Sequence, residues 1–106
     1  MVKEITVQEL HALMDEGKRP VLVDVREAHE LDICKLPYDH HIPVGQLSVR
    51  YSELDPAADI VVYCRSGGRS GMACETLQAY GFGSVRNLVG GVLAWGREID
   101  PSFREY

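Results

Sequence analysis

Two apolar runs rich in β-branched residues constrain the fold of this chain more than any other feature of its sequence. One is "PVLVDV" at residues 20–25, and the other is "IVVYC" at residues 60–64. A strand with one face in solvent alternates apolar and polar residues, whereas a continuous run rich in β-branched residues is typical of a strand covered on both faces. The two runs therefore predict the centre of a sheet with helices on either side.

A helix is predicted between the N-terminus and the first of these runs, at residues 7–16. Thr6 and Glu9 have the spacing of a capping box, in which each side chain bonds the backbone N–H of the other residue. Apolar residues follow at helical spacing, and Gly17 is expected to end the helix. This N-terminal helix would cover part of one face of the sheet.

The remaining segments continue the alternation of strands and helices. Ser70 is the expected N-cap of a helix that ends at Gly81. The other expected elements are a short helix at 26–33, an extended stretch at 41–43, a strand at 84–91 and a last helix at 91–99. This order predicts an α/β fold of three layers, with a mostly parallel central sheet and helices on both faces.

Size and charge exclude several classes of function. The chain has 106 residues, the size of one domain, and we expect residues 1–106 to form it. The formal net charge of -5 argues against a nucleic-acid surface, which needs a basic stripe. No apolar run approaches the length of a membrane span, and the N-terminus lacks the pattern of a secretory signal. We therefore expect a cytoplasmic protein without a nucleic-acid or membrane partner.

The second apolar run ends in a cysteine that begins a loop, "CRSGGRS" at residues 64–70. The carboxyl ends of strands in open α/β sheets are where ligands bind. Gly67 and Gly68 let the backbone turn with several N–H groups pointing inward, and the next helix adds the positive end of its dipole. Such surroundings stabilise an anion and lower the pKa of a cysteine, so a reactive Cys64 thiolate is predicted.

Two arginines in the loop, Arg65 and Arg69, add positive charge that suits a small dianionic substrate. Solvated surface charge without a role is the alternative for each of them. For Cys64 the alternative is a buried structural thiol, since cysteine is among the most buried residue types. The glycines and arginines beside Cys64 favour the reactive interpretation.

The other two cysteines are expected to be structural. Their spacing from Cys64 contains no CxxC pair, so neither a disulfide framework nor a zinc site is indicated. Cys74 lies in the middle of an expected helix and should pack in the core. Cys34 is interpreted as a partly buried structural residue, with a resolving thiol for oxidised Cys64 as the alternative.

Four polar residues outside the loop are candidates for binding or structural support. Asp24 and Arg26 stand at the end of the first apolar run, where they are expected to tie neighbouring loops together by hydrogen bonds. His40 and His41 are adjacent in an extended segment, so their side chains point to opposite sides and make a poor metal pair. No metal site is predicted.

Four ordered motifs together resemble single-domain rhodaneses, a family of sulfurtransferases, over nearly the whole chain. They are "VLVDVRE", "ELDICKLPYDHHIP", "VVYCRSGGRS" and "NLVGGVLAW". The resemblance implies that Cys64 carries a sulfane sulfur as a persulfide, without a metal or organic cofactor. It implies that the sulfur is cradled by Arg65, Ser66, Gly67, Gly68, Arg69 and Ser70. The donor would be a small anion such as thiosulfate or a persulfide, and the acceptor would be cyanide, a thiol or a sulfur-carrier protein.

The motif at residues 30–43 departs from the usual family pattern. Cys34-Lys35 stand where Gly-His is usual, and Tyr38-Asp39 stand where Gly-Ala is usual. This segment looks more like rhodanese domains that are attached to adenylating enzymes acting on sulfur-carrier proteins. Substrate preference is therefore left open by the resemblance.

Two other functions are compatible with the sequence. Cysteine-dependent phosphatases and arsenate reductases resemble a C-x5-R pattern, but here the sixth residue after Cys64 is Ser70 and the arginine comes one place earlier. The second alternative is a rhodanese-like module that only docks or senses. A complete loop around a cysteine favours catalysis over docking.

Overall fold

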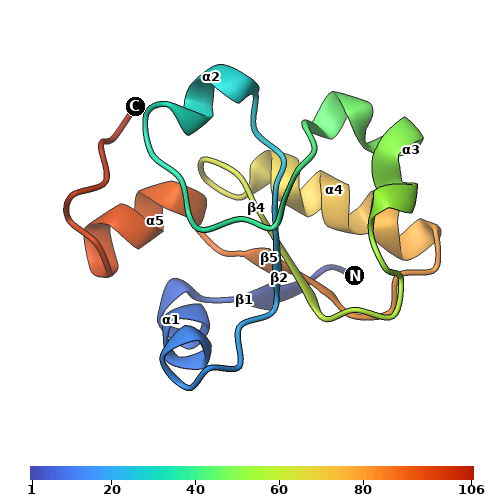
Figure 1. The fold of residues 1–106 in the computed structure, drawn as a ribbon, viewed down its shortest axis with the longest axis horizontal. Coiled ribbons are helices and arrows are strands. Elements are labelled where there is room, and N and C mark those ends of the chain that lie inside the picture. Colours follow the sequence, from blue (N-terminus) through green and yellow to red (C-terminus); the bar gives the residue numbers. More distant parts are fainter.

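A parallel sheet of five strands forms the centre of the domain (Figure 1). The computed structural model describes all 106 residues. The strands are β1 (Lys3–Ile5), β2 (Val21–Asp24), β3 (His40–His41), β4 (Ile60–Tyr63) and β5 (Val85–Leu88). Their order is β1-β5-β4-β2-β3, and every neighbouring pair is parallel. The predicted runs at 20–25 and 60–64 thus lie side by side near the middle of the sheet.

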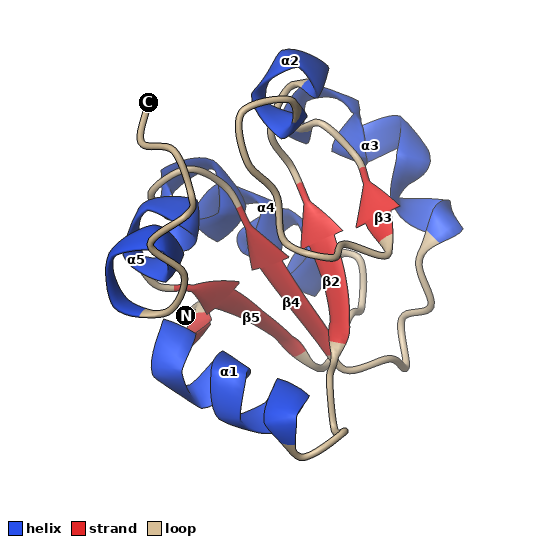
Figure 2. Ribbon diagram, turned by 60° about the vertical axis from the view of Figure 1, so that its left-hand side comes forward, coloured by secondary structure: helices blue, strands red, loops and turns tan.

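Helices cover both faces of this sheet (Figure 2). They are α1 (Val7–Asp15), α2 (Ala28–Leu31), α3 (Leu47–Arg50), α4 (Gly68–Ala79) and α5 (Gly91–Glu98), with single 3-10 turns at Val44–Gln46 and Tyr51–Glu53. The α1 and α5 helices pack on one face, and α3 and α4 pack on the other. None of the helices is long and apolar enough to cross a membrane.

The two central strands send alternate side chains into two separate apolar clusters. Along β4, Ile60 and Val62 enter the cluster beneath α4, whereas Val61 and Tyr63 enter the cluster beneath α1 and α5. All four side chains are fully buried. The prediction of a three-layer fold with a central parallel sheet is confirmed, because only a strand covered on both faces can bury every residue.

The first helix begins as predicted. Thr6 is its N-cap, the Thr6 hydroxyl accepts from the backbone N–H of Glu9, and the Glu9 carboxylate accepts from the backbone N–H of Thr6. The helix ends at Asp15, and Gly17 follows with a φ of +70°. The capping box and the terminal glycine were therefore sufficient to predict where this helix begins and ends.

Local patterns predicted the short elements less well. No strand was predicted at Lys3–Ile5, which pairs with β5, and only an extended stretch was expected where His40–His41 pairs with β2. The helix expected at 26–33 is restricted to Ala28–Leu31. These elements are so short that pairing and packing, rather than their own sequence, define them.

Candidate active site

The loop after β4 carries Cys64 to the carboxyl end of the sheet and leads into α4. Gly67 is the N-cap of that helix and has a φ of +108°, which glycine adopts without strain. The helix consequently begins at Gly68, two residues before the expected N-cap. The prediction that Ser70 caps α4 is wrong, because the left-handed turn at Gly67 brings the chain into the helix earlier and places Ser70 in its first turn.

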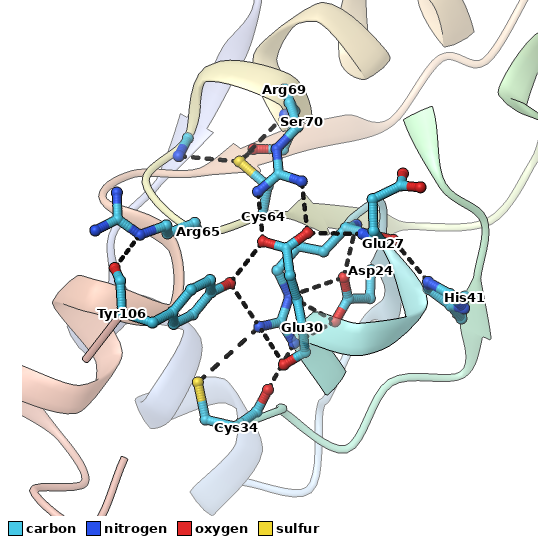
Figure 3. A network of polar contacts seen from close by, with 12 residues as sticks. Asp24, Glu27, Glu30, Cys34, His41, Cys64, Arg65, Arg69, Ser70 and Tyr106 are labelled. Atoms are coloured by element: carbon cyan, nitrogen blue, oxygen red, sulfur yellow. Dashed lines mark hydrogen bonds and ion pairs between the residues drawn. The ribbon is translucent and has the colours of Figure 1, made fainter. Parts of the chain in front are cut away.

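The Cys64 sulfur lies at the centre of this loop and is surrounded by hydrogen-bond donors (Figure 3). Cys64 Sγ accepts from the backbone N–H groups of Gly67 at 3.1 Å and Ser70 at 3.4 Å, and the Ser70 hydroxyl is 3.3 Å away. Cys64 is buried, with 1% of its surface exposed. The loop is therefore folded around the sulfur as a cradle for negative charge.

The balance of effects at this sulfur favours the thiolate. Burial raises the pKa of Cys64. Hydrogen bonds from the hydroxyl and amide of Ser70 and from the amides of Gly67 and Ser66 together lower the pKa by more than burial raises it, so the net shift is downward. A lowered pKa increases the fraction of thiolate, the nucleophilic form of cysteine, near neutral pH. The direction agrees with the expectation from the glycine-rich loop.

The Arg69 side chain reaches from the loop to the Glu30 carboxylate on α2 (Figure 3). The two guanidinium nitrogens donate to the two carboxylate oxygens of Glu30 at 2.7 and 2.8 Å. This pair lowers the pKa of Glu30 to about 2, chiefly through the hydrogen bonds from Arg69. Arg69, whose charge the sequence predicts to suit a dianionic substrate, is therefore paired with Glu30 in the structure.

Arg65 is also engaged by another part of the chain. Its Nε donates to the backbone oxygen of Tyr106, and its guanidinium lies over the Tyr106 ring, 5.3 Å from the centroid. The Tyr106 hydroxyl in turn donates to Glu30 Oε1 at 2.9 Å. Residues from the loop, from α2 and from the C-terminal segment thus form one polar network beside Cys64.

Asp24 and Arg26 form a fully buried ion pair behind this network. Arg26 Nη2 donates to Asp24 Oδ2 at 2.8 Å and to the backbone oxygen of Cys34 at 2.7 Å. Arg26 Nη1 donates to the Tyr106 hydroxyl at 3.0 Å. The pair connects β2, the segment after α2 and the C-terminal residue by hydrogen bonds.

The other cysteines lie away from the centre of the loop. Cys74 is fully buried in the apolar cluster beneath α4, and burial raises the pKa of its thiol to about 12. Cys34 is half-buried and lies on the far side of Glu30 and Tyr106 from Cys64 (Figure 3). His41 Nε2 forms a hydrogen bond with the backbone oxygen of Arg26 at 2.7 Å.

Three residues of the site were not recognised from the sequence: Glu30, Asn87 and Tyr106. Asn87 is a buried polar residue of β5 that contacts both Ser70 and Gly67. A polar residue inside the expected strand "SVRNLVGG" was the available signal, since a buried amide needs partners. Glu30 and Tyr106 gave no comparable signal, because their partners are distant in the sequence.

The start of α5 holds the loop from the opposite face of the sheet. The backbone N–H groups of Val92 and Leu93 donate to the carbonyl oxygens of Cys64 at 3.0 Å and Arg65 at 3.1 Å. Gly91 has a φ of +56°, and a Cβ at this position would lie 2.4 Å from the Cys64 carbonyl oxygen. Only glycine permits this close approach of the helix to the loop.

Replacing Gly91 by alanine is expected to lower the free energy of unfolding by about 2–4 kcal/mol, from backbone strain together with overpacking against the loop. Gly17→Ala is the matched control, since Gly17 has a φ of +70° but nothing lies within 4 Å of a Cβ there. The control should lose only about 1 kcal/mol. Urea unfolding of both variants measures the difference, and equal losses would contradict a role for the close approach of α5.

Comparisons with known proteins show which proteins this chain resembles. A family model described as "Rhodanese-like domain" matches residues 6–98. The chain is 38% identical over 101 residues to a sulfurtransferase of Allochromatium vinosum, an alignment that covers 95% of this chain and 94% of that protein. It superposes on a rhodanese-like domain protein from Staphylococcus aureus with a TM-score of 0.83 and 28% identity, over 99% of both chains.

A longer relative is the adenylyltransferase and sulfurtransferase MOCS3-1 of Zea mays, with 36% identity over 109 residues. The alignment covers 96% of this chain but only 23% of the maize protein. The chain therefore spans about a quarter of the length of that relative.

Proposed function

The chain belongs to the family of rhodanese-like domains, and on that premise we propose that it is a sulfurtransferase that uses Cys64 as its nucleophile. The sulfane sulfur would come from a small anion such as thiosulfate or from a persulfide. It would be carried as a Cys64 persulfide and passed to cyanide, a thiol or a sulfur-carrier protein. The observation that carries this proposal is the Cys64 sulfur inside a ring of amide and hydroxyl donors.

The first half of the reaction loads the sulfur. The Cys64 thiolate attacks the outer sulfur of thiosulfate, a new S–S bond forms, and the old S–S bond breaks as sulfite leaves with its electron pair. The product is an anionic persulfide. The N–H groups of Gly67 and Ser70, which face the sulfur in the resting protein, are placed to stabilise the negative charge of this intermediate.

The second half of the reaction unloads the sulfur. A nucleophile such as cyanide attacks the outer sulfur of the persulfide, and the Cys64 thiolate leaves with the electron pair of the S–S bond. Thiocyanate forms from cyanide, and a new persulfide forms when the acceptor is a thiol. The same donors that lower the pKa of Cys64 make it a good leaving group, so one loop serves both halves.

Arg65 and Arg69 are proposed to attract the anionic donor. An arriving anion meets Arg69 already held by the Glu30 carboxylate and Arg65 already bonded to Tyr106. Because the Glu30 carboxylate offsets the charge of Arg69, steering of the anion rests more on Arg65 than on Arg69. The likeness to the maize adenylyltransferase and sulfurtransferase supports sulfur transfer as the reaction, and a protein acceptor is part of the proposal.

Loading of sulfur on Cys64 tests the proposed function directly. The reduced protein is incubated briefly with thiosulfate, or in parallel with a low-molecular-weight persulfide, then desalted and analysed by intact mass. We expect the native protein and Cys34→Ser to gain one sulfur atom that cyanide removes, and Cys64→Ser to gain none. Cys34→Ser is the matched control because Cys34 is half-buried and lies outside the loop. If neither donor loads native protein whose Cys64 is still alkylated, the proposal fails and a docking module is favoured.

A further inference from the structure

The buried side chain of Asn87 has no part in the sulfur transfer described above. Asn87 lies on β5, next to β4 in the sheet, and only 8% of its surface is exposed. Its Nδ2 donates to the backbone oxygen of Gly67 at 3.1 Å. Its Oδ1 lies 2.5 Å from the Ser70 hydroxyl. The amide thus joins two residues that both bond the Cys64 sulfur.

These contacts fix the orientation of the amide and the position of one proton. The Gly67 carbonyl oxygen has no proton, so the NH₂ group of Asn87 must face it, and Oδ1 must then face Ser70. Oδ1 only accepts hydrogen bonds, so the Ser70 hydroxyl is the donor in that contact. A hydroxyl has a single proton, and while Asn87 accepts it the Ser70 oxygen cannot donate to Cys64.

The proton position decides which form of Cys64 the hydroxyl stabilises. When the Ser70 proton is on the Asn87 side, the Ser70 oxygen can accept from the S–H of a neutral Cys64 but cannot stabilise a thiolate. When the hydroxyl rotates toward the sulfur, 3.3 Å away, it donates to the thiolate and Asn87 Oδ1 loses its partner. Thiolate and amide therefore compete for one donor.

We propose that Asn87 is a positioning residue that controls the ionisation of Cys64 by competing with the sulfur for the hydroxyl proton of Ser70. In the resting protein this competition keeps part of the Cys64 population as the neutral thiol. When negative charge develops on the sulfur, the Ser70 hydroxyl rotates away from Asn87 and donates its hydrogen bond to the sulfur. Its importance for catalysis rests on the proposed function, in which Cys64 is the nucleophile. Its effect on ionisation does not require sulfur transfer to occur.

Other groups around Cys64 influence the same ionisation and stay in place when Asn87 is changed. The amides of Gly67 and Ser70 donate to the sulfur whatever the hydroxyl does. The charged or titratable groups of the neighbouring elements are Asp24 at the end of β2, Arg26 after it, Glu30 on α2, Arg65 in the loop, Arg69 and Cys74 on α4, and Tyr106. Asn87 variants are therefore compared in proteins with and without the Ser70 hydroxyl. This comparison separates the effects of the other groups from the competition for the Ser70 proton.

The test is the pH dependence of alkylation of Cys64 by iodoacetamide, followed by mass spectrometry in a Cys34→Ser protein. Asn87→Ala removes the competing acceptor. At pH values below the midpoint of the Cys64 titration, we therefore expect alkylation to become about 3- to 10-fold faster, the equivalent of one released hydrogen bond. In a Ser70→Ala background the same substitution should change the rate less than twofold. A slower reaction of Asn87→Ala, or an equal change in both backgrounds, would show that Asn87 acts only by holding the loop and would overturn the proposal.

A second variant decides the question if Asn87→Ala does not fold. Asn87→Asp keeps an acceptor facing Ser70 and makes it stronger, so it should slow alkylation more in the Ser70 background than in the Ser70→Ala background. Equal slowing in both would leave only the effect of the added charge and would overturn the proposal. Alkylation needs no sulfur donor, so a protein that takes up no sulfur but shows these shifts contradicts the proposed function while supporting the role of Asn87.

Discussion

The Cys64→Ser variant is expected to transfer sulfur from thiosulfate to cyanide at least about 10³-fold more slowly than the native protein. A serine hydroxyl is not ionised at neutral pH and forms no persulfide, so the loop would hold a group that cannot accept the sulfur. The substitution is small, and the fold should be retained because Cys64 is one of many residues in its apolar cluster. Thiocyanate formation measures the rate.

The control for this variant is Cys34→Ser, which should keep most of the native rate. A Cys64→Ser protein with more than a tenth of native activity would mean that another thiol carries the sulfur. Cys34 would then be the candidate, because Cys74 is fully buried and the pKa of its thiol is raised to about 12. Combining both substitutions would identify that thiol.

The Arg26→Met variant is expected to lose about 3–5 kcal/mol of its free energy of unfolding. The substitution leaves the Asp24 carboxylate fully buried without its cation, while the methionine fills a similar volume. Domains of this size have a total stability of about 5–15 kcal/mol, so the variant should lose a large fraction of that stability. Urea titration followed by the fluorescence of Trp95, the only tryptophan, provides the measurement.

Arg97→Met is the matched control for this second prediction. Arg97 pairs with Glu105 at the surface, where both side chains are more than half exposed, and its removal should leave stability nearly unchanged. Replacing both Asp24 and Arg26 by apolar residues should recover part of the loss, since no unpaired charge would remain. Equal stability of Arg26→Met and Arg97→Met would contradict the supporting role of the buried pair.

The central part of the fold could be predicted because its signals are local and redundant. Continuous apolar runs mark β2 and β4, and the capping box of Thr6 marks α1. The edge strands could not be predicted, because Lys3–Ile5 and His40–His41 are strands only through pairing with β5 and β2. Ser70 was assigned as an N-cap by the local rule, and the left-handed turn at Gly67 overrode that rule.

The site was predictable to the extent that it is contiguous in the sequence. Cys64 and the glycine-rich loop indicate inward N–H groups without any tertiary information, and the structure has that arrangement. The partners of the loop come from elsewhere: Glu30 contacts Arg69 across 39 positions, and Tyr106 contacts Arg65 across 41. Such pairings depend on how the sheet brings distant segments together, so the partners of the two arginines could not be predicted from the sequence.

The loop around Cys64 is held by the starts of two helices that pack on opposite faces of the sheet. The first turn of α4 supplies donors to the sulfur, and the first turn of α5 binds the carbonyl oxygens of Cys64 and Arg65. Each helix is positioned by a different apolar cluster. The pKa of Cys64 therefore depends on the packing of both helix layers. Loosening of either layer will change the reactivity of the Cys64 sulfur before the sheet unfolds.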